Sequence, residues 1–145
     1  MKIRIWVIAS LLLSIGCRPA REDKEKNLES ISDTKVLQYA IQGKMLYEQF
    51  CANCHQNNGE GLGRLIPPLN QADYMLNDVG NTVKIIKYGL KGEIVVNGIT
   101  YNQAMPGNPQ LTDLEIAQLV TYLYNIWGSN RGVIDANQVR GYLDN

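Results

Sequence analysis

The segment Cys51-Ala52-Asn53-Cys54-His55 constrains this chain more than any other part of its sequence. Two cysteines separated by two residues can form thioether bonds to the two vinyl groups of one haem, and the adjacent histidine can bind the haem iron. His55 is the only histidine in the chain, so no second histidine of the chain can bind the same iron. The motif therefore predicts one covalently attached haem c, with Cys51 and Cys54 as attachment points and His55 as an iron ligand.

Two other chemistries use paired cysteines, and the rest of the sequence argues against both. A thioredoxin-like redox dithiol is expected in a βαβ unit, whereas a helical pattern precedes this motif and a Gly-rich loop follows it. A structural zinc site needs four ligands, and the chain after residue 33 contains neither a second cysteine pair nor a further histidine. Haem attachment is therefore the prediction that uses all three side chains.

The second axial ligand of the iron is expected to be a methionine, because a thioether raises the reduction potential of an electron-transfer haem. After the apolar N-terminal run the candidates are Met45, Met75 and Met105. Met45 lies in the helical pattern before the haem motif at a spacing suited to packing, and Met75 lies in an apolar helix start that favours a core position. Met105 stands in a loop before Pro106-Gly107, with a predicted helix after it as an anchor. We therefore expect Met105 to be the ligand.

The first residues of the chain are typical of a signal peptide. Lys2 and Arg4 precede an apolar run over residues 5–15, which is too short to span a bilayer. The run ends at Gly16-Cys17, which resembles a bacterial lipobox, where cleavage precedes a cysteine that becomes lipidated. We expect a signal peptide over residues 1–16 and a protein exported to the periplasmic side. The alternative is an ordinary secretory signal with a chance cysteine.

Residues 17–33 are polar, mixed in charge and almost free of large apolar side chains, so we expect a flexible tether. A chain of this length reaches roughly 20 Å, which would hold a small domain near the membrane through a lipid on Cys17. Without Lys2 and Arg4 of the signal, the remaining chain has a net charge of −2. This near-neutral balance gives no indication of a nucleic-acid partner.

The pattern after residue 33 predicts one domain over residues 34–128 and a C-terminal extension over 129–145. Asn97-Gly98 lies between β-branched residues, as in a hairpin turn, and Thr112 with Glu115 forms a capping-box pattern. The predicted elements are a helix that begins after Asp33 and leads to Cys51, a loop over residues 57–69, a short helix near residue 72, a helix over 81–88, a hairpin over 94–101, a helix from Thr112 to Gly128 and a short helix over 135–143.

The order of these elements resembles that of a bacterial class I c-type cytochrome with one haem, from about residue 34 to 127. In this family the first and last helices cross closely at a glycine and an aromatic residue, positions that Gly43 and Tyr47 occupy here. Leu119 and Tyr122 match the contacts from the last helix. The resemblance implies an all-α cytochrome c fold, with crossed N- and C-terminal helices around one haem and a small β-hairpin insert before the methionine loop.

The resemblance also implies a hydrogen bond from the His55 ring to a proline carbonyl, which orients the ring and raises its basicity as a ligand. Pro67 and Pro68 are both candidates. Further polar side chains near the motifs could bind a haem propionate or tune the methionine sulfur, and each could equally lie in a solvated loop: Arg64, Tyr101 and Asn102.

The function implied by the resemblance is that of a single-electron carrier, not an enzyme, serving redox partner proteins of a bacterial respiratory chain. The expected lipid on Cys17 would tether this carrier to the membrane. With His55 and Met105 on the iron, no axial position stays open for a small-molecule substrate. One alternative is a peroxidase-like haem enzyme, which needs a distal acid or base. The other is a haem subunit docked permanently on an oxidase or reductase.

Overall fold

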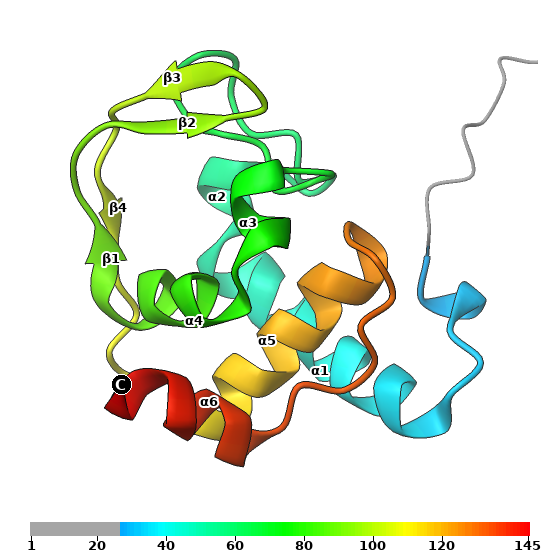
Figure 1. Ribbon diagram of the computed structural model, residues 1–145. Helices are drawn as coiled ribbons and strands as arrows, with labels where there is room; N and C mark the ends of the chain where they lie inside the picture. Colours follow the sequence, from blue (N-terminus) through cyan, green and yellow to red (C-terminus); the bar gives the residue numbers. More distant parts are fainter. Residues whose placement is uncertain (1–26) are drawn as a thin grey trace, which may run out of the picture.

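The computed structural model describes residues 27–145 (Figure 1). The expected signal peptide (1–16), Cys17 and most of the expected tether lie outside the described residues. From residue 27 onward, no helix has both the length and the apolar character needed to cross a membrane.

The described chain is mostly helical, with two small antiparallel ladders, which confirms the expected fold class (Figure 1). In chain order the elements are the 3-10 turn η1 (Leu28–Ser30), α1 (Thr34–Phe50), α2 (Ala52–His55), α3 (Asp73–Asn77), α4 (Val79–Tyr88), β1 (Gly89–Leu90), β2 (Ile94–Val96), β3 (Ile99–Tyr101), β4 (Met105–Pro106), α5 (Asp113–Ile126) and α6 (Ala136–Asp144).

Helix α1 begins where the sequence indicated, because the Asp33 carboxylate accepts hydrogen bonds from Lys35 N and Val36 N. Val36 and Ala40 of the expected apolar stripe are buried, and so are Gly43 and Tyr47, the residues expected at the helix crossing. Met45 was also expected to pack, but its side chain is 60% exposed, so that prediction was wrong. The glycine allows a closer approach of α5 than a row of large side chains would.

Helices α1 and α5 cross at Gly43 (Figure 1). A Cβ atom at this position would lie 2.1 Å from Gln118 O and 2.7 Å from Tyr122 Cβ, so only glycine permits this approach. Beside the crossing, the Tyr47 ring packs 5.7 Å from that of Tyr122 and 4.9 Å from that of Trp127, measured between centroids. These aromatic rings pack within the buried core beside the close helix contact.

Helix α5 is the central element, since it packs against α1, α4 and α6. It begins with the predicted capping box, in which the Thr112 side chain accepts from Glu115 N and the Glu115 carboxylate accepts from Thr112 N. Helix α4 begins two residues earlier than predicted, because the Asp78 carboxylate caps it by accepting from Asn81 N.

The residues at both ends of the expected domain pack onto it. Leu28 and Ile31, in the last part of the expected tether, contact the core beside α1. At the other end α6 contacts both α4 and α5, and Thr121 of α5 exchanges two hydrogen bonds with Ile134, at 3.0 and 3.3 Å. Segment 129–145 is therefore integrated into the helical core.

The strands lie away from the α1/α5 crossing, with β1 beside α4 and β2 beside α3 (Figure 1). The predicted hairpin is present as β2 and β3, with Asn97 and Gly98 at positive φ in the turn. A second ladder, which the sequence pattern did not indicate, pairs β1 with β4 and sets Leu90 opposite Met105. This ladder joins the end of α4 to the segment that contains Met105.

Candidate functional site

A largely apolar cavity with an open mouth lies between the helices and the strands, and its space, including solvent at the mouth, is about 980 Å³. Its walls come from α2, the loop before α3, both α3 and α4, the strands and the inner face of α5. The cavity-lining side chains that can ionise are, within the described chain, Cys51, Cys54, His55, Tyr74 and Tyr101.

Both cysteines of the motif line this cavity. Cys51 ends α1 and is partly buried, whereas Cys54 lies in the short helix α2 and is exposed, and the two thiols form no disulfide. Burial, with a smaller contribution from Cys54, raises the pKa of the Cys51 thiol to about 12. A reactive redox dithiol has a lowered thiol pKa, so this environment does not suit thioredoxin-like exchange.

The side chain of His55 is buried against the cavity, with 7% of its surface exposed. Its Nδ1 atom lies 3.0 Å from Pro67 O, which gives Nδ1–H an acceptor and leaves Nε2 for a metal ion. Burial lowers the pKa of His55, partly offset by the hydrogen bond to Pro67, and this favours the neutral ring that binds metals. Of the two prolines considered from the sequence, Pro67 therefore supplies the carbonyl, while Pro68 also lines the cavity.

The α1/α5 crossing is hydrogen-bonded to the residue that directly follows the haem motif. The Tyr47 hydroxyl donates to the carbonyl oxygen of Gln56, the residue after His55, at 2.5 Å. Burial, followed by the nearby thiol of Cys51, raises the pKa of Tyr47, so the hydroxyl keeps its proton as a donor. The sequence pattern marked Tyr47 only as a packing residue.

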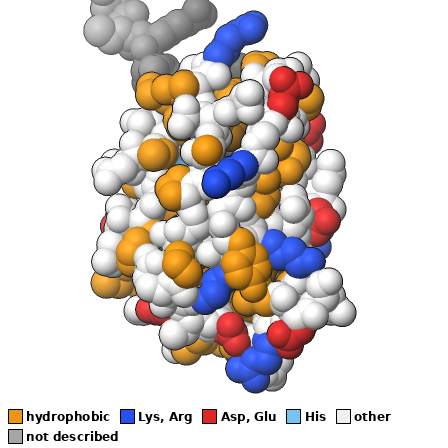
Figure 2. Space-filling model, turned by 90° about the vertical axis from the view of Figure 1, so that its left-hand side faces the viewer, with side chains coloured by type: hydrophobic (Ala, Val, Ile, Leu, Met, Phe, Trp, Pro, Cys, Tyr) orange, Lys and Arg blue, Asp and Glu red, His pale blue; other side chains and the backbone are white. Residues whose placement is uncertain are grey.

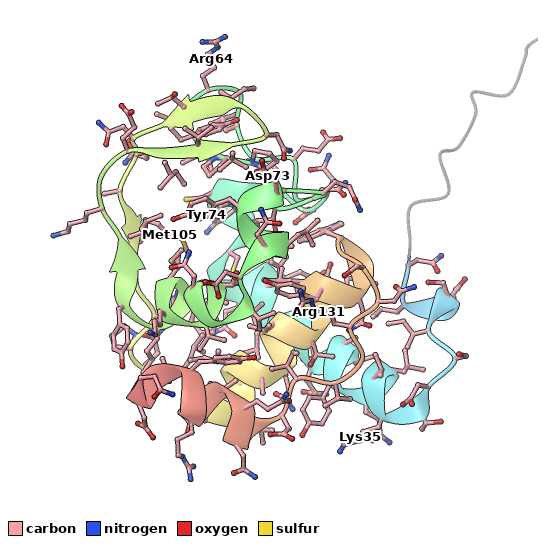
Figure 3. All side chains as sticks on the ribbon, viewed as in Figure 1. Lys35, Arg64, Asp73, Tyr74, Met105 and Arg131 are labelled. Atoms are coloured by element: carbon pink, nitrogen blue, oxygen red, sulfur yellow. The ribbon has the colours of Figure 1, made fainter. Side chains whose placement is uncertain are left out.

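Met105 reaches the cavity from β4, on the side opposite α2 (Figures 1 and 3). Its side chain is partly buried, and its backbone is held in the ladder with Leu90. Met75 also lines the cavity from α3 and is 4% exposed, in agreement with its expected core position. The Met75 carbonyl accepts a hydrogen bond from the Tyr124 hydroxyl, which fixes the backbone of α3 against α5.

The three polar side chains considered from the sequence lie in different places. Tyr101 is buried in the cavity wall, and its hydroxyl donates to Gly63 O at 3.4 Å. Arg64 and Asn102 are exposed and do not line the cavity, and Arg64 points away from the rest of the molecule (Figure 3). Thr82 and Leu90 also line the cavity, from α4 and β1, and no sequence pattern indicated them because their contact with it depends on how these elements pack.

The residues around the cavity fit a covalently held haem. A haem is a flat, mostly apolar macrocycle, and the apolar walls match it, while two unpaired thiols and one buried imidazole stand together at one wall. Over residues 27–145, no three side chains of His, Cys, Asp or Glu gather into a site for a bare metal ion. The donor set thus suits a macrocycle that brings its own four nitrogen ligands.

Comparison with known proteins agrees with this geometry. Residues 40–127 match the family model described as Cytochrome c. The chain is 36% identical over 104 residues to cytochrome c-552 of Thermus thermophilus, an alignment that covers 69% of this chain and 74% of the relative. It is also 30% identical over 102 residues to the alcohol dehydrogenase (quinone), cytochrome c subunit, of Gluconobacter oxydans. That alignment covers 68% of this chain but 21% of the relative. The chain therefore belongs to the cytochrome c family, as a class I monohaem c-type cytochrome that carries covalently bound haem c and transfers electrons.

Proposed function

We propose that this cytochrome is a membrane-tethered single-electron carrier of a bacterial respiratory chain, with His55 and Met105 as the two axial ligands of its haem iron. The observation that carries the proposal is the apolar cavity that His55 lines from α2 and Met105 lines from β4. Cys51 and Cys54, beside His55, attach the haem through thioether bonds. The haem supplies a reversible one-electron change of its iron.

The protein residues supply orientation and exclusion of water. Pro67 fixes the plane of the His55 ring through the hydrogen bond to Nδ1, and this raises the donor strength of the ring as a ligand. The apolar side chains of the cavity keep water from the iron, which together with a thioether ligand favours a high reduction potential. His55 and Met105 would hold the haem iron in both oxidation states, and the haem would supply one-electron exchange with little rearrangement of these residues.

A haem enzyme is disfavoured by the composition of the cavity wall. A peroxidase needs a distal acid or base over an open iron position. The lining residues within the described chain include no arginine, lysine or carboxylate, and His55 is the only histidine. With Met105 on the iron, peroxide would first have to displace a ligand. We therefore expect peroxide turnover no faster than that of haem proteins with both axial positions filled.

The protein surface is suited to brief contact with redox partners. The face toward β1 and β4 shows hydrophobic side chains interspersed with basic and acidic ones, so no single charge dominates it (Figure 2). Transient electron-transfer contacts are small, typically below about 1,200 Å², and this face can supply such an area. A lipid on Cys17 would raise the local concentration of membrane-bound partners without fixing their orientation.

A second candidate role is that of a haem subunit docked permanently on a larger redox enzyme. It is favoured by the similarity to the cytochrome c subunit of an alcohol dehydrogenase (quinone), although the chain spans about a fifth of that protein. The two roles share the same haem chemistry and differ in mobility. Detergent extraction of native membranes separates them, since a free carrier migrates alone and a subunit migrates with its enzyme.

The ligand assignment is tested by three methionine variants of the haem-loaded protein. We expect Met105→Ala to abolish the near-infrared band of ferric haem ligated by methionine and to lower the reduction potential. Met45→Ala is the matched control, because Met45 is exposed on α1, far from the cavity lining. Loss of the band in Met75→Ala but not in Met105→Ala would assign the ligand to α3 instead.

The anchor is tested separately through Cys17. We expect Cys17→Ala to move haem protein from the membrane fraction to the soluble fraction without changing its absorption spectrum. Recovery of the wild-type protein in the soluble periplasmic fraction would contradict lipidation, while leaving the ligand assignment intact.

A further inference from the structure

Lys87, in the last turn of α4, binds the segment that follows Met105. Its Nζ atom donates to Pro109 O at 2.9 Å and to Leu111 O at 2.7 Å. A lysine in this position commonly interacts with the last carbonyl groups of its own helix. Here the ammonium group instead joins α4 to the loop between β4 and α5.

That loop has few other attachments to α4. Besides the two-residue ladder of β1 and β4, one backbone hydrogen bond within the described chain joins them, from Asn108 N to Ile86 O at 2.9 Å. Gly107 lies directly against the end of α4, since a Cβ atom there would be 2.5 Å from the carbonyl carbon of Tyr88. The position of Met105 thus depends on a short segment held by a small number of contacts.

The Lys87 ammonium group binds these carbonyl groups, and within residues 27–145 it has no carboxylate at ion-pair distance. The ion pairs within residues 27–145 are Lys44 with Glu48 and Arg140 with Asp113. Hydrogen bonds from a charged donor are stronger than those between neutral groups. The bond to Leu111 O is partly buried, whereas the bond to Pro109 O is exposed. Lys87 therefore attaches the loop to α4 through two charge-assisted hydrogen bonds.

We propose that Lys87 is a positioning residue for Met105, whose ammonium group latches residues 107–111 to α4 and limits how often the Met105 thioether moves out of the cavity. The inference rests on the proposed role of Met105 as an axial ligand. Lys87 would then influence the position of Met105 although it lies outside the cavity lining and contacts neither the haem motif nor Met105 itself.

The test uses haem-loaded protein and binding of exogenous imidazole to the ferric form, which requires the methionine to leave the iron. Lys87→Met keeps the aliphatic length and removes the donors, whereas Lys87→Arg keeps a charged donor. Lys84→Met is the matched charge control, because Lys84 lies one turn earlier on α4 and makes no side-chain hydrogen bond or ion pair within the described chain. Val139→Ala is the stability control, because Val139 is fully buried in α6, outside the cavity lining.

We expect Lys87→Met to raise the rate of imidazole binding about tenfold, which corresponds to about 1.4 kcal/mol in the opening of the loop. Lys87→Arg should restore most of the wild-type rate, and Lys84→Met should leave it unchanged. Val139→Ala should lower the midpoint of guanidinium unfolding without accelerating imidazole binding. If Lys87→Met yields too little folded protein, Lys87→Gln is the milder variant, with a change in the same direction.

Two results would overturn the latch. In the first, Lys87→Met and Lys84→Met bind imidazole at the same rate. In the second, Val139→Ala accelerates binding as much as Lys87→Met does, so that general destabilisation accounts for the effect. A failure of the ligand assignment has a different signature, because Met105→Ala would then keep the near-infrared band. In that case the latch loses its premise and is rejected with it.

Discussion

The two walls of the haem cavity are held in different ways. The wall with Cys51 and His55 lies at the α1/α5 crossing, where Tyr47 and Trp127 are almost completely buried and a hydrogen bond from Tyr47 reaches Gln56. The wall with Met105 is held by a two-residue ladder and a short loop. The first wall is therefore part of the main core, and the second is an attachment to it.

This difference in attachment fits the chemical role that we propose for each wall. Thioether bonds and a buried imidazole need a wall that does not move, because it defines where the haem lies. The methionine ligand that we propose would tune the potential, and how often it left the iron would depend on how firmly its loop is held. Two-stranded ladders of this length contribute little stability alone. Substitutions in the first wall should therefore mainly lower the free energy of unfolding. Substitutions in the second wall should mainly change how often Met105 leaves the cavity.

The largest expected effect is that of Gly43→Ala at the helix crossing. The new Cβ atom would meet the Gln118 carbonyl oxygen at 2.1 Å, so α1 and α5 must separate. We expect a loss of at least about 3 kcal/mol in the free energy of unfolding, measured with guanidinium. Gly141→Ala is the control, since a Cβ atom there meets nothing within 4 Å and helix propensity rises. A stability of Gly43→Ala equal to that of the wild type would contradict the close crossing.

For Gly107→Ala we expect a smaller loss of unfolding free energy than for Gly43→Ala, but a larger effect on the Met105 ligand. Its Cβ atom would lie 2.7 Å from Gly89 N and 2.7 Å from Lys87 O, which pushes the loop away from α4. We expect a loss of about 2 kcal/mol in unfolding free energy, a weaker near-infrared band and faster imidazole binding. Gly43→Ala should leave imidazole binding close to that of the wild type. Equal acceleration in both variants would mean that the two walls are not mechanically distinct.

Tyr47→Phe tests the hydrogen bond that connects the α1/α5 crossing to the end of the haem motif. This change removes the hydrogen bond to Gln56 O but keeps the ring against Tyr122 and Trp127. We expect a loss of about 1 kcal/mol in unfolding free energy, with the near-infrared band unchanged. Tyr88→Phe is the control, because the Tyr88 side chain is exposed. A loss no larger than that of Tyr88→Phe would show that the hydrogen bond does not support the motif.

Local rules made the haem wall predictable. The spacing of Cys51, Cys54 and His55 serves one cofactor, and the resemblance to class I cytochromes located the helix crossing at Gly43. The capping box of α5 and the Asn97-Gly98 hairpin follow equally local rules. These features agree with the structure because a few neighbouring residues determine each of them.

The features that sequence did not reveal depend on contacts between distant segments. Pro67 and Pro68 are alike in sequence, and only the path of the loop decides that Pro67 O faces His55. Met45 follows the helical apolar spacing, yet the requirement for a close crossing at Gly43 turns it to solvent. The bonds from Lys87 to Pro109 and Leu111 span more than 20 positions and leave no local pattern.

The smallest expected effect concerns Glu115, in the first turn of α5, where the Met105 loop joins the core helix. Hydrogen bonds from the Thr112 backbone and hydroxyl lower the pKa of Glu115 from its ordinary value of 4.5, and the charge of Lys87 adds a smaller lowering. A carboxyl group with a lowered pKa in the folded state stabilises that state above the pKa of the unfolded chain. This stabilisation is lost as the pH falls below 4.5 and through the folded pKa.

Glu115→Gln keeps an acceptor for Thr112 N but carries no charge. Because Glu115 lies near the surface, we expect the wild type to exceed this variant by a few tenths of a kcal/mol at neutral pH. In guanidinium unfolding the difference should vanish well below pH 4.5, while imidazole binding at neutral pH should be the same in both proteins. A difference that grows as the pH falls would have the opposite sign and would contradict the role of the carboxylate as a helix cap.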